Sequence, residues 1–139
     1  MNAVDTNILL YSIDRAEPAK QTKAQNLLRQ LYGETNRTFL LWQVLGELTQ
    51  QLRRWRDQGK LSPGEFYNHI HAFRHVFPLL LPTSSAFDNA LSLAESFSLS
   101  HWDSMILGAC QAVGISVLFT EDMGAPRVIN GIELINPLT

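Results

Sequence analysis

Four acidic residues lie at the ends of expected strands or the starts of expected helices, positions that an ordinary surface charge does not explain. Asp5 directly follows a short strand-like stretch, and Asp122 follows another across a single residue. Glu47 and Asp103 lie near the starts of two expected helices. Four carboxylates around one pocket repel each other, by roughly 3 kcal/mol for a pair about 5 Å apart at an effective dielectric constant near 20. Such a cluster implies a bound cation, and oxygen ligands without Cys or His favour Mg²⁺ or Mn²⁺ over zinc.

Each acid on its own also has a structural explanation. Asp5 and Asp103 suit the N-cap or first turn of a helix, where a negative charge gains about 0.3–1 kcal/mol from the helix dipole. Asp122 suits a turn, and Glu47 could be a solvated position beside the buried face of its helix. Capping and metal binding are compatible roles, and the order and contexts of the four acids together favour a site.

The rest of the chain predicts the elements that must hold these acids. Short apolar runs indicate strands, and apolar residues at a spacing of three and four indicate helices. The expected strands cover residues 2–4, 38–41, 78–82, 116–120 and 132–135, the last of them an edge strand. The first two expected helices cover residues 7–13 and 18–32, and the third runs from Val44 to near Gly59. A fourth is opened by Ser62-Pro63-Gly64-Glu65 and runs through Phe73, and a fifth is capped by Ser84 and Ser85 and runs through Ala94. The last runs from His101 to Val113 and stops at Gly114.

Strands and helices alternate along the chain, and the strands are continuously apolar. This pattern predicts a single α/β domain over residues 1–139, an α/β/α sandwich with a mostly parallel central sheet flanked by helices. Ligand sites of such folds lie outside the carboxyl ends of the strands, where the helix N-termini also open. The predicted fold therefore brings all four acids to one edge.

The composition excludes some classes of protein. With 45% hydrophobic and 17% charged residues the chain fits a folded globular protein, and its net charge of −2 provides no global basic field for nucleic acid. An RNA or DNA partner would then depend on a local basic patch, on metal ions or on a second protein. The single Cys110 rules out an internal disulfide. No signal segment and no apolar run of about 18 residues is found, so we expect a soluble cytoplasmic protein without a membrane partner.

Four segments resemble the signature segments of a known family. The stretches "VDTNILLYSID", "VLGEL", "LSHWDSMILGAC" and "VLFTEDM…GIELINP" look like those of PIN domains, and most like those of VapC-type ribonuclease toxins of bacterial toxin–antitoxin pairs. The resemblance extends from residue 2 to residue 138. It implies an Mg²⁺- or Mn²⁺-dependent endoribonuclease, a cognate antitoxin and a homodimer.

The resemblance also assigns roles to individual residues. The family's acids fall on Asp5, Glu47, Asp103 and Asp122, and its supporting polar residues fall on Thr6, Asn7 and Thr120. On this basis Asp5 and Asp103 anchor a metal, with Asp122 as a third ligand or a partner through water. Glu47 binds a second metal or orients the attacking water as a general base. Hydrolysis of this kind leaves 5′-phosphate and 3′-hydroxyl ends.

Basic residues cluster at the end of the helix that contains Glu47. Arg53, Arg54 and Arg56, with Lys60 nearby, could stabilise the helix C-terminus and improve solubility, or could contact RNA phosphates. The sequence favours neither use.

Histidines and aromatic residues have less specific patterns. His69, His71 and His75 invite a zinc site, but no Cys or fourth ligand accompanies them. His101 is expected to pack at the rim of the site beside Trp102. The expected core includes the aromatic residues Trp42, Trp55, Phe66 and Phe73, any of which would offer a groove for a partner helix, such as an antitoxin tail, if exposed.

Three other functions stay open at this point. The chain could be a PIN-type nuclease for housekeeping RNA maturation, which the sequence does not separate from a toxin. It could be a non-catalytic binding module that keeps the acids for structure. It could also be a metal-dependent phosphatase or phosphoacceptor domain with Asp5 as nucleophile, although no lysine lies in the later strand–loop segments.

Overall fold

A six-stranded sheet with the strand order β3-β2-β1-β4-β6-β5 forms the centre of the fold. The structure is a computed structural model that describes residues 1–34 and 37–139. The strands are β1 (Asn2–Val4), β2 (Thr38–Leu41), β3 (Leu79–Leu80), β4 (Val117–Phe119), β5 (Arg127–Ile129) and β6 (Ile132–Ile135). Strand β1 is central and pairs in parallel with both β2 and β4. The carboxyl ends of β1 and β4 therefore lie side by side.

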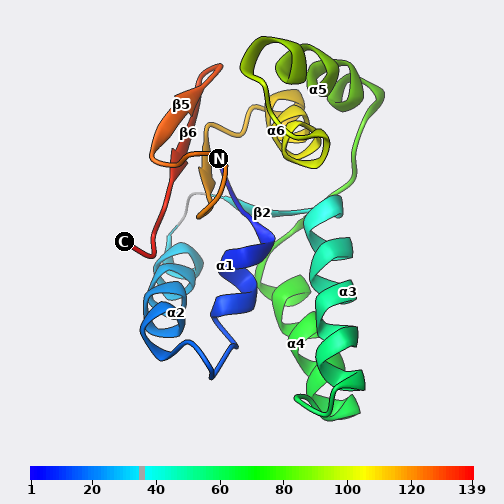
Figure 1. The fold of residues 1–139 in the computed structure, drawn as a ribbon, viewed down its shortest axis with the longest axis vertical. Coiled ribbons are helices and arrows are strands. Elements are labelled where there is room, and N and C mark those ends of the chain that lie inside the picture. The colour runs from blue at the N-terminus through cyan, green and yellow to red at the C-terminus, as the bar shows by residue number, and fades with distance from the viewer. Residues whose placement is uncertain (35–36) are drawn as a thin grey trace.

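Six helices in the described part of the chain flank this sheet. They are α1 (Thr6–Tyr11), α2 (Pro18–Gly33), α3 (Trp42–Asp57), α4 (Pro63–Val76), α5 (Ser84–Phe97) and α6 (His101–Val113). In Figure 1, α1 to α4 lie in the lower half of the molecule, and α5 and α6 lie together in the upper half. No helix in residues 1–34 and 37–139 combines the length and the apolar character needed to cross a membrane.

The predicted fold class is confirmed, because the sheet is mostly parallel and helices flank it. Only β5 runs antiparallel to its neighbour among the described strands, where Val128 lies opposite Glu133. The parallel strands are buried: Leu40 on β2, Leu118 on β4 and Leu134 on β6 are at most 2% exposed. Strands covered on both faces read as continuous apolar runs, which is the pattern of the sequence.

The edge of the sheet differs from the prediction. Strand β6 was expected at the edge, but it lies between β4 and β5, and β5 was not predicted. The two strands form a hairpin around Asn130-Gly131, both of which have positive φ angles, 49° and 84°. An Asn-Gly pair between Ile129 and Ile132 is the sequence signal for such a turn. The short strand was missed because Arg127 and Val128 are exposed and give no apolar run.

Other local predictions vary in outcome. The capping box is confirmed: the Glu65 backbone N–H donates to Ser62 Oγ, and the Glu65 side chain accepts from the Ser62 backbone N–H. The predicted caps Ser84 and Ser85 are wrong, because the N-cap of α5 is Thr83. Strand β3 is only two residues long, since the predicted strand included prolines at both ends, which lack a backbone N–H for the sheet.

Helices α5 and α6 approach each other at a glycine. A Cβ on Gly108 of α6 would lie 2.8 Å from the backbone nitrogen of Ala90 in α5, and closer still to the carbonyl oxygen of Ala86. Only a residue without a side chain fits this contact. The close packing fixes α6, and with it the first turn that carries Asp103.

Candidate active site

Asp5 occupies the position that the sequence predicted, directly after β1 and at the N-cap of α1. The backbone N–H of Thr6 donates to Asp5 Oδ1 at 2.7 Å, and the hydroxyl of Thr120 donates to Asp5 Oδ2 at 2.8 Å. The residue is only 4% exposed. Both carboxylate oxygens are therefore held in place by residues from two different elements.

The environment of Asp5 makes its negative charge costly. Burial raises the pKa of the Asp5 carboxyl to about 6, against the lowering effect of the hydrogen bonds from Thr120 and Thr6. The charges of Glu47 and Asp122 raise this pKa further. A neighbouring positive charge therefore stabilises the ionised form of this buried carboxyl more than that of a solvated one.

Asp122 lies beyond the end of β4 and is tied to the same frame. Its side-chain Oδ2 accepts a hydrogen bond of 2.8 Å from Asn7 Nδ2, and its backbone N–H donates to Thr120 Oγ1 at 3.0 Å. The Thr120 hydroxyl thus bridges Asp5 and the chain at Asp122. Asn7 connects the loop after β4 to α1.

Glu47 comes to the site from α3. Its Oε2 accepts from the Thr6 hydroxyl at 2.7 Å, and its Oε1 accepts from Gln43 Nε2 at 2.8 Å. Thr6 therefore joins two acids, Asp5 through its backbone N–H and Glu47 through its side chain.

Asp103 lies in the first turn of α6, as predicted. Its backbone N–H donates to Ser100 Oγ at 3.2 Å, so Ser100, which the sequence analysis did not single out, caps this helix. Burial raises the pKa of the Asp103 carboxyl, and the charges of Asp122 and Glu47 raise it as well. The charges of Asp122 and Glu47 thus act on Asp103, which shares no hydrogen bond with either among the described residues.

The predicted residues therefore gather at one end of the sheet, and their chemistry fits a hard cation. All the donors are oxygen atoms, which Mg²⁺ and Mn²⁺ prefer. Asn7 Oδ1 is buried without a hydrogen-bond partner among the described residues, and a buried acceptor of this kind calls for a ligand or water. In residues 1–34 and 37–139 no three acid, His or Cys side chains converge into a complete metal-binding cluster.

Two groups of residues around the site were missed by the sequence analysis. Gln43 Nε2 donates both to Glu47 and to the carbonyl oxygen of Trp102, at 3.1 Å. Its spacing of four residues from Glu47 on a helix was the available signal. The second group joins Tyr11, Lys20 and Glu121.

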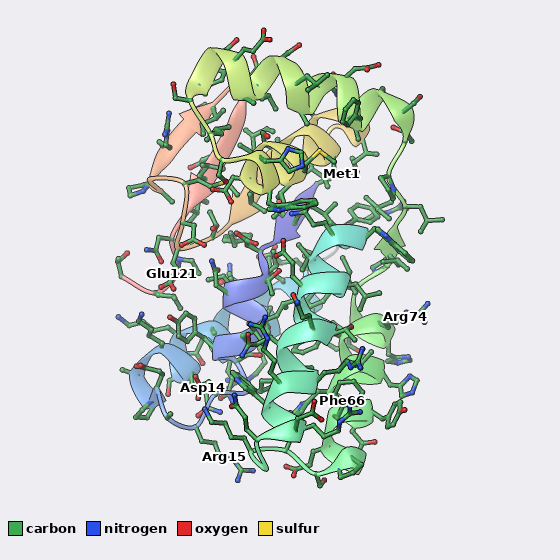
Figure 2. The ribbon with its side chains drawn as sticks, turned by 45° about the vertical axis from the view of Figure 1, so that its right-hand side comes forward. Met1, Asp14, Arg15, Phe66, Arg74 and Glu121 are labelled. Carbon is green, nitrogen blue, oxygen red and sulfur yellow. The ribbon has the colours of Figure 1, made fainter. Side chains whose placement is uncertain are left out.

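The side chain of Glu121 contacts Tyr11 and Lys20, whereas its neighbour Asp122 contacts Asn7. The Tyr11 hydroxyl donates to Glu121 Oε1 at 2.8 Å, and Lys20 Nζ lies 3.3 Å from Oε2. Figure 2 shows Glu121 at the level where the upper and lower groups of helices meet. Of the two adjacent acids, Asp122 is the one that faces the site residues.

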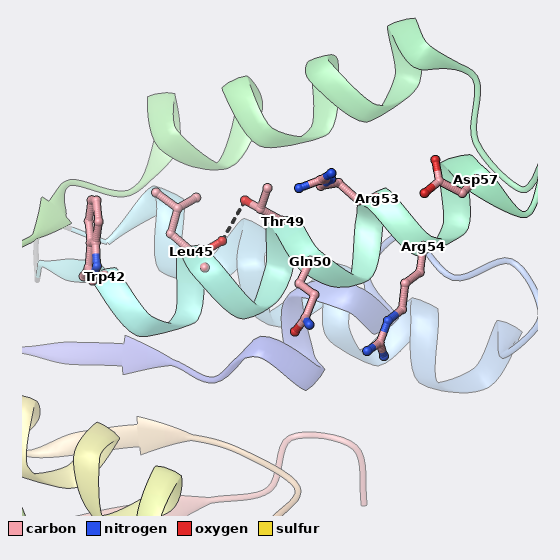
Figure 3. A pocket seen from close by; sticks show the side chains of 8 residues that line it. Trp42, Leu45, Thr49, Gln50, Arg53, Arg54 and Asp57 are labelled. Carbon is pink, nitrogen blue, oxygen red and sulfur yellow. Dashed lines mark hydrogen bonds between the residues drawn. The ribbon is translucent and has the colours of Figure 1, made fainter.

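A groove of about 580 Å³ runs along the exposed face of α3. Figure 3 shows Trp42, Gln50, Arg53 and Arg54 along it. Arg56 does not line the groove. Its guanidinium lies 4.7 Å from the centre of the Phe66 ring, and its Nε lies 3.3 Å from Asp57 Oδ1.

The histidines contribute to packing and surface. His71 stacks on Tyr67 with ring centres 6.4 Å apart, and His69 is half-buried, with its pKa lowered by burial. No metal-binding cluster is present around them in the part of the chain that the structure describes. His101 contacts Trp102 edge to face at 4.5 Å.

Trp42 is not a core residue, contrary to the prediction. It is 54% exposed, whereas Phe66 and Phe73 are buried and Trp55 is half-buried. Trp42 begins α3 directly after β2, so its side chain faces outward at the edge of the helix. It lines a second, uncharged groove of about 340 Å³, together with Leu81, Phe87 and Trp102.

Comparison with known proteins identifies the family of this arrangement. A family model described as "PIN domain" matches residues 3–129. Among curated proteins, none matches the sequence.

Several solved structures share the fold. A toxin–antitoxin complex from Klebsiella pneumoniae is 18% identical, with a TM-score of 0.67 and coverage of 99% of this chain and 98% of that one. VapBC-1 from nontypeable Haemophilus influenzae is 15% identical, with a TM-score of 0.71 and the same coverage. VapC20 from Mycobacterium tuberculosis, described as a sarcin-ricin loop cleaving toxin, is 18% identical, with a TM-score of 0.65 and coverage of 89% and 92%. The resemblance seen in the sequence is confirmed at the level of family and fold.

Proposed function

The chain belongs to the PIN domain family, and from that membership we propose that it is a metal-dependent endoribonuclease that acts as the toxin of a toxin–antitoxin pair. The support comes from the site and from neighbours whose names describe toxins and an RNA-loop-cleaving enzyme. We propose that residues 1–139 form a single nuclease domain and that it acts in the cytoplasm.

The shared hydrogen bonds of the acids are the observation that carries this proposal. Thr6 contacts both Asp5 and Glu47, and Thr120 contacts both Asp5 and the backbone of Asp122. Capping of a helix requires no more than one acid at its N-terminus. It does not explain why Thr6 and Thr120 each hydrogen-bond to two acidic residues. A divalent cation bound here, Mg²⁺ or Mn²⁺, would orient a phosphate, offset negative charge and lower the pKa of a bound water.

The residues of the chain divide the work. We assign Asp5 and Asp103 as the main cation ligands and Asp122 as a further ligand, directly or through water. Glu47 orients the water that attacks phosphorus, or holds a second cation. As the new bond to phosphorus forms, the bond to the ribose 3′-oxygen breaks, which leaves a 5′-phosphate and a 3′-hydroxyl.

The same geometry argues against a phosphoacceptor role for Asp5. A nucleophilic carboxylate must present an accessible oxygen in line with phosphorus, whereas a hydrogen-bonded oxygen can still bind a cation through its remaining lone pair. Both oxygens of Asp5 accept short hydrogen bonds, and the residue is 4% exposed.

We propose that the RNA strand leaves the acids along the groove on α3. Arg54 is seven residues, about two helical turns, beyond Glu47, so both lie on the same side of the helix. Arg53 and Arg54 line the groove, whereas Arg56 is engaged with Phe66 and Asp57. Of the three arginines that the sequence offered as possible RNA contacts, we therefore propose Arg53 and Arg54 for this role.

We further propose two protein partners. The neighbours that were solved as toxin–antitoxin complexes support a cognate antitoxin, which co-purification with the product of an adjacent reading frame would test. For a homodimer, the groove lined by Trp42, Leu81, Phe87 and Trp102 is suitable, because a surface without charges can contact its own copy without repulsion. Light scattering of Leu81→Glu, with Tyr67→Glu as an exposed control, would test that contact.

Cleavage of a panel of structured RNAs tests the enzymatic proposal. Wild-type protein should cleave with Mg²⁺ or Mn²⁺ and not with EDTA, and its products should carry 5′-phosphates. Asp5→Asn and Asp103→Asn should abolish cleavage, whereas Asp88→Asn on the exposed face of α5 should retain it.

Other outcomes would each point elsewhere. Ends with a 2′,3′-cyclic phosphate would overturn the mechanism, because they indicate attack by the ribose 2′-hydroxyl. Cleavage that survives both substitutions would indicate another site or a contaminant. A protein that neither cleaves RNA nor binds Mn²⁺ in calorimetry would be a binding module rather than a nuclease.

A further inference from the structure

Gln43 forms a direct link between two of the candidate site's helices. It lies in the first turn of α3, where its side-chain Nε2 donates to Glu47 Oε1 at 2.8 Å and to the carbonyl oxygen of Trp102 at 3.1 Å. A primary amide has two N–H groups, so both are used in these two contacts. Trp102 is the residue before Asp103 on α6.

The link restrains Glu47 on a second side. Thr6 donates to Glu47 Oε2, and Gln43 donates to Oε1, so each carboxylate oxygen has one protein donor. Each oxygen keeps acceptor capacity for a further ligand, because an ionised carboxylate offers about four lone-pair positions. The side chain is thus oriented without being saturated.

The link also holds two negative charges near each other. Glu47 lies on α3, which follows β2, and Asp103 lies on α6, which follows α5. The charges of the two carboxylates favour their separation. A neutral bridge from Gln43 connects the Glu47 side chain to the backbone beside Asp103, and it adds no positive charge that would compete with a cation. A Lys or Arg in the same place would neutralise part of the negative charge of Glu47 and Asp103, which attracts the cation.

We propose that Gln43 is a positioning residue, which sets the separation and orientation of Glu47 and Asp103 for binding of a divalent cation. This inference rests on the proposed function. Residues that orient metal ligands in this way typically contribute about 10–100-fold to metal affinity or activity.

The chain offers a matched control for the test. Gln43 is four residues before Glu47, and Gln51 is four residues after it on the same helix, without a side-chain hydrogen bond among the described residues. Gln43→Met and Gln51→Met remove the same amide at similar volume. Mn²⁺ binding to the metal-free protein is measured by calorimetry, thermal unfolding is measured alongside, and cleavage is followed over a range of Mn²⁺ concentrations.

Gln43→Met should weaken Mn²⁺ binding by about 10-fold or more, whereas Gln51→Met should bind like wild type. Cleavage by Gln43→Met should recover as Mn²⁺ is raised, because the ligands remain present and only their arrangement is loosened. A purely structural role would instead lower the unfolding temperature and leave the Mn²⁺ affinity of the folded protein unchanged.

The outcomes separate this inference from the proposed function. Wild-type protein that binds Mn²⁺ and cleaves RNA, with Gln43→Met equal to it in Mn²⁺ affinity, would overturn the role of Gln43 alone. Equal losses in Gln43→Met and Gln51→Met would overturn it as well. Wild-type protein that neither binds Mn²⁺ nor cleaves RNA would overturn both.

Discussion

The hydroxyl of Thr120 donates to Asp5 Oδ2 at 2.8 Å across 115 positions of sequence. Thr120 Oγ1 also accepts a hydrogen bond of 3.0 Å from the backbone N–H of Asp122. One fully buried side chain at the end of β4 thus sets the position of two acids, one beyond each of two neighbouring parallel strands. The edge of the sheet, rather than any single loop, determines the geometry of the site.

Removal of this hydroxyl should disturb the acids. Thr120→Val keeps the branched shape but leaves Asp5 Oδ2 without its donor, which should destabilise the protein by about 1–3 kcal/mol and weaken Mn²⁺ binding. Thr120→Ser keeps the donor and should bind Mn²⁺ like wild type. Urea unfolding and Mn²⁺ calorimetry of both variants check this; equal Mn²⁺ binding by Val and Ser variants would contradict it.

The stability of the metal-free protein should fall as pH rises from about 4 to 6. The pKa of Asp5 is about 6 in the folded protein against an ordinary value of 3.8, so the folded state binds more protons than the unfolded state in this window. The loss from Asp5 should amount to roughly 3 kcal/mol, at about 1.4 kcal/mol for each pKa unit. The raised pKa of Asp103 acts in the same direction.

Urea unfolding in EDTA at pH 4, 5, 6 and 7 measures this dependence. Asp5→Asn should show a smaller fall and should be more stable than wild type at pH 7, because it carries no buried charge. Mg²⁺ should restore stability to the wild type and not to the variant. A metal-free wild type whose stability rises with pH over this range would contradict the prediction.

Two glycines should respond to alanine in opposite directions. Gly108→Ala forces a Cβ against the backbone of α5 and should destabilise the fold by about 1–3 kcal/mol. Gly46→Ala in α3 meets no atom within 4 Å and should stabilise the protein by up to about 1 kcal/mol, because alanine favours a helix. Thermal unfolding of the two variants measures both effects, and similar shifts would contradict the close contact of α5 with α6.

Substitutions of the three arginines of α3 should have different effects on RNA binding and on stability. Arg53→Ala and Arg54→Ala should each weaken RNA binding and lower the salt slope of the affinity by about 1, because each loses a phosphate contact. Arg56→Ala should leave the slope unchanged and lower stability, since it loses its contact with the Phe66 ring. Binding assays at several salt concentrations, with Asp5→Asn protein to prevent cleavage, measure the slopes. A slope that Arg56→Ala lowers as much as Arg54→Ala would contradict the proposed path.

The sequence by itself determined the order of the elements and the residues of the candidate site. Apolar runs and helix periodicity are local properties, so the parallel sheet and the acids at Asp5 and Asp122 could be predicted from them. The Asn130-Gly131 hairpin was equally readable from local residues, but it was missed beside two exposed strand residues.

Only the tertiary structure decided how the acids are held and which surface residues are free. The contacts of Thr120 with Asp5 and of Gln43 with Trp102 join residues that are far apart in the chain. Trp42 was expected in the core and is exposed. For Arg56 the sequence left open an RNA contact or a structural role, and its guanidinium packs on Phe66. Burial and side-chain contacts of this kind depend on which elements meet in space, and a local pattern carries no information about neighbours that the chain brings together only by folding.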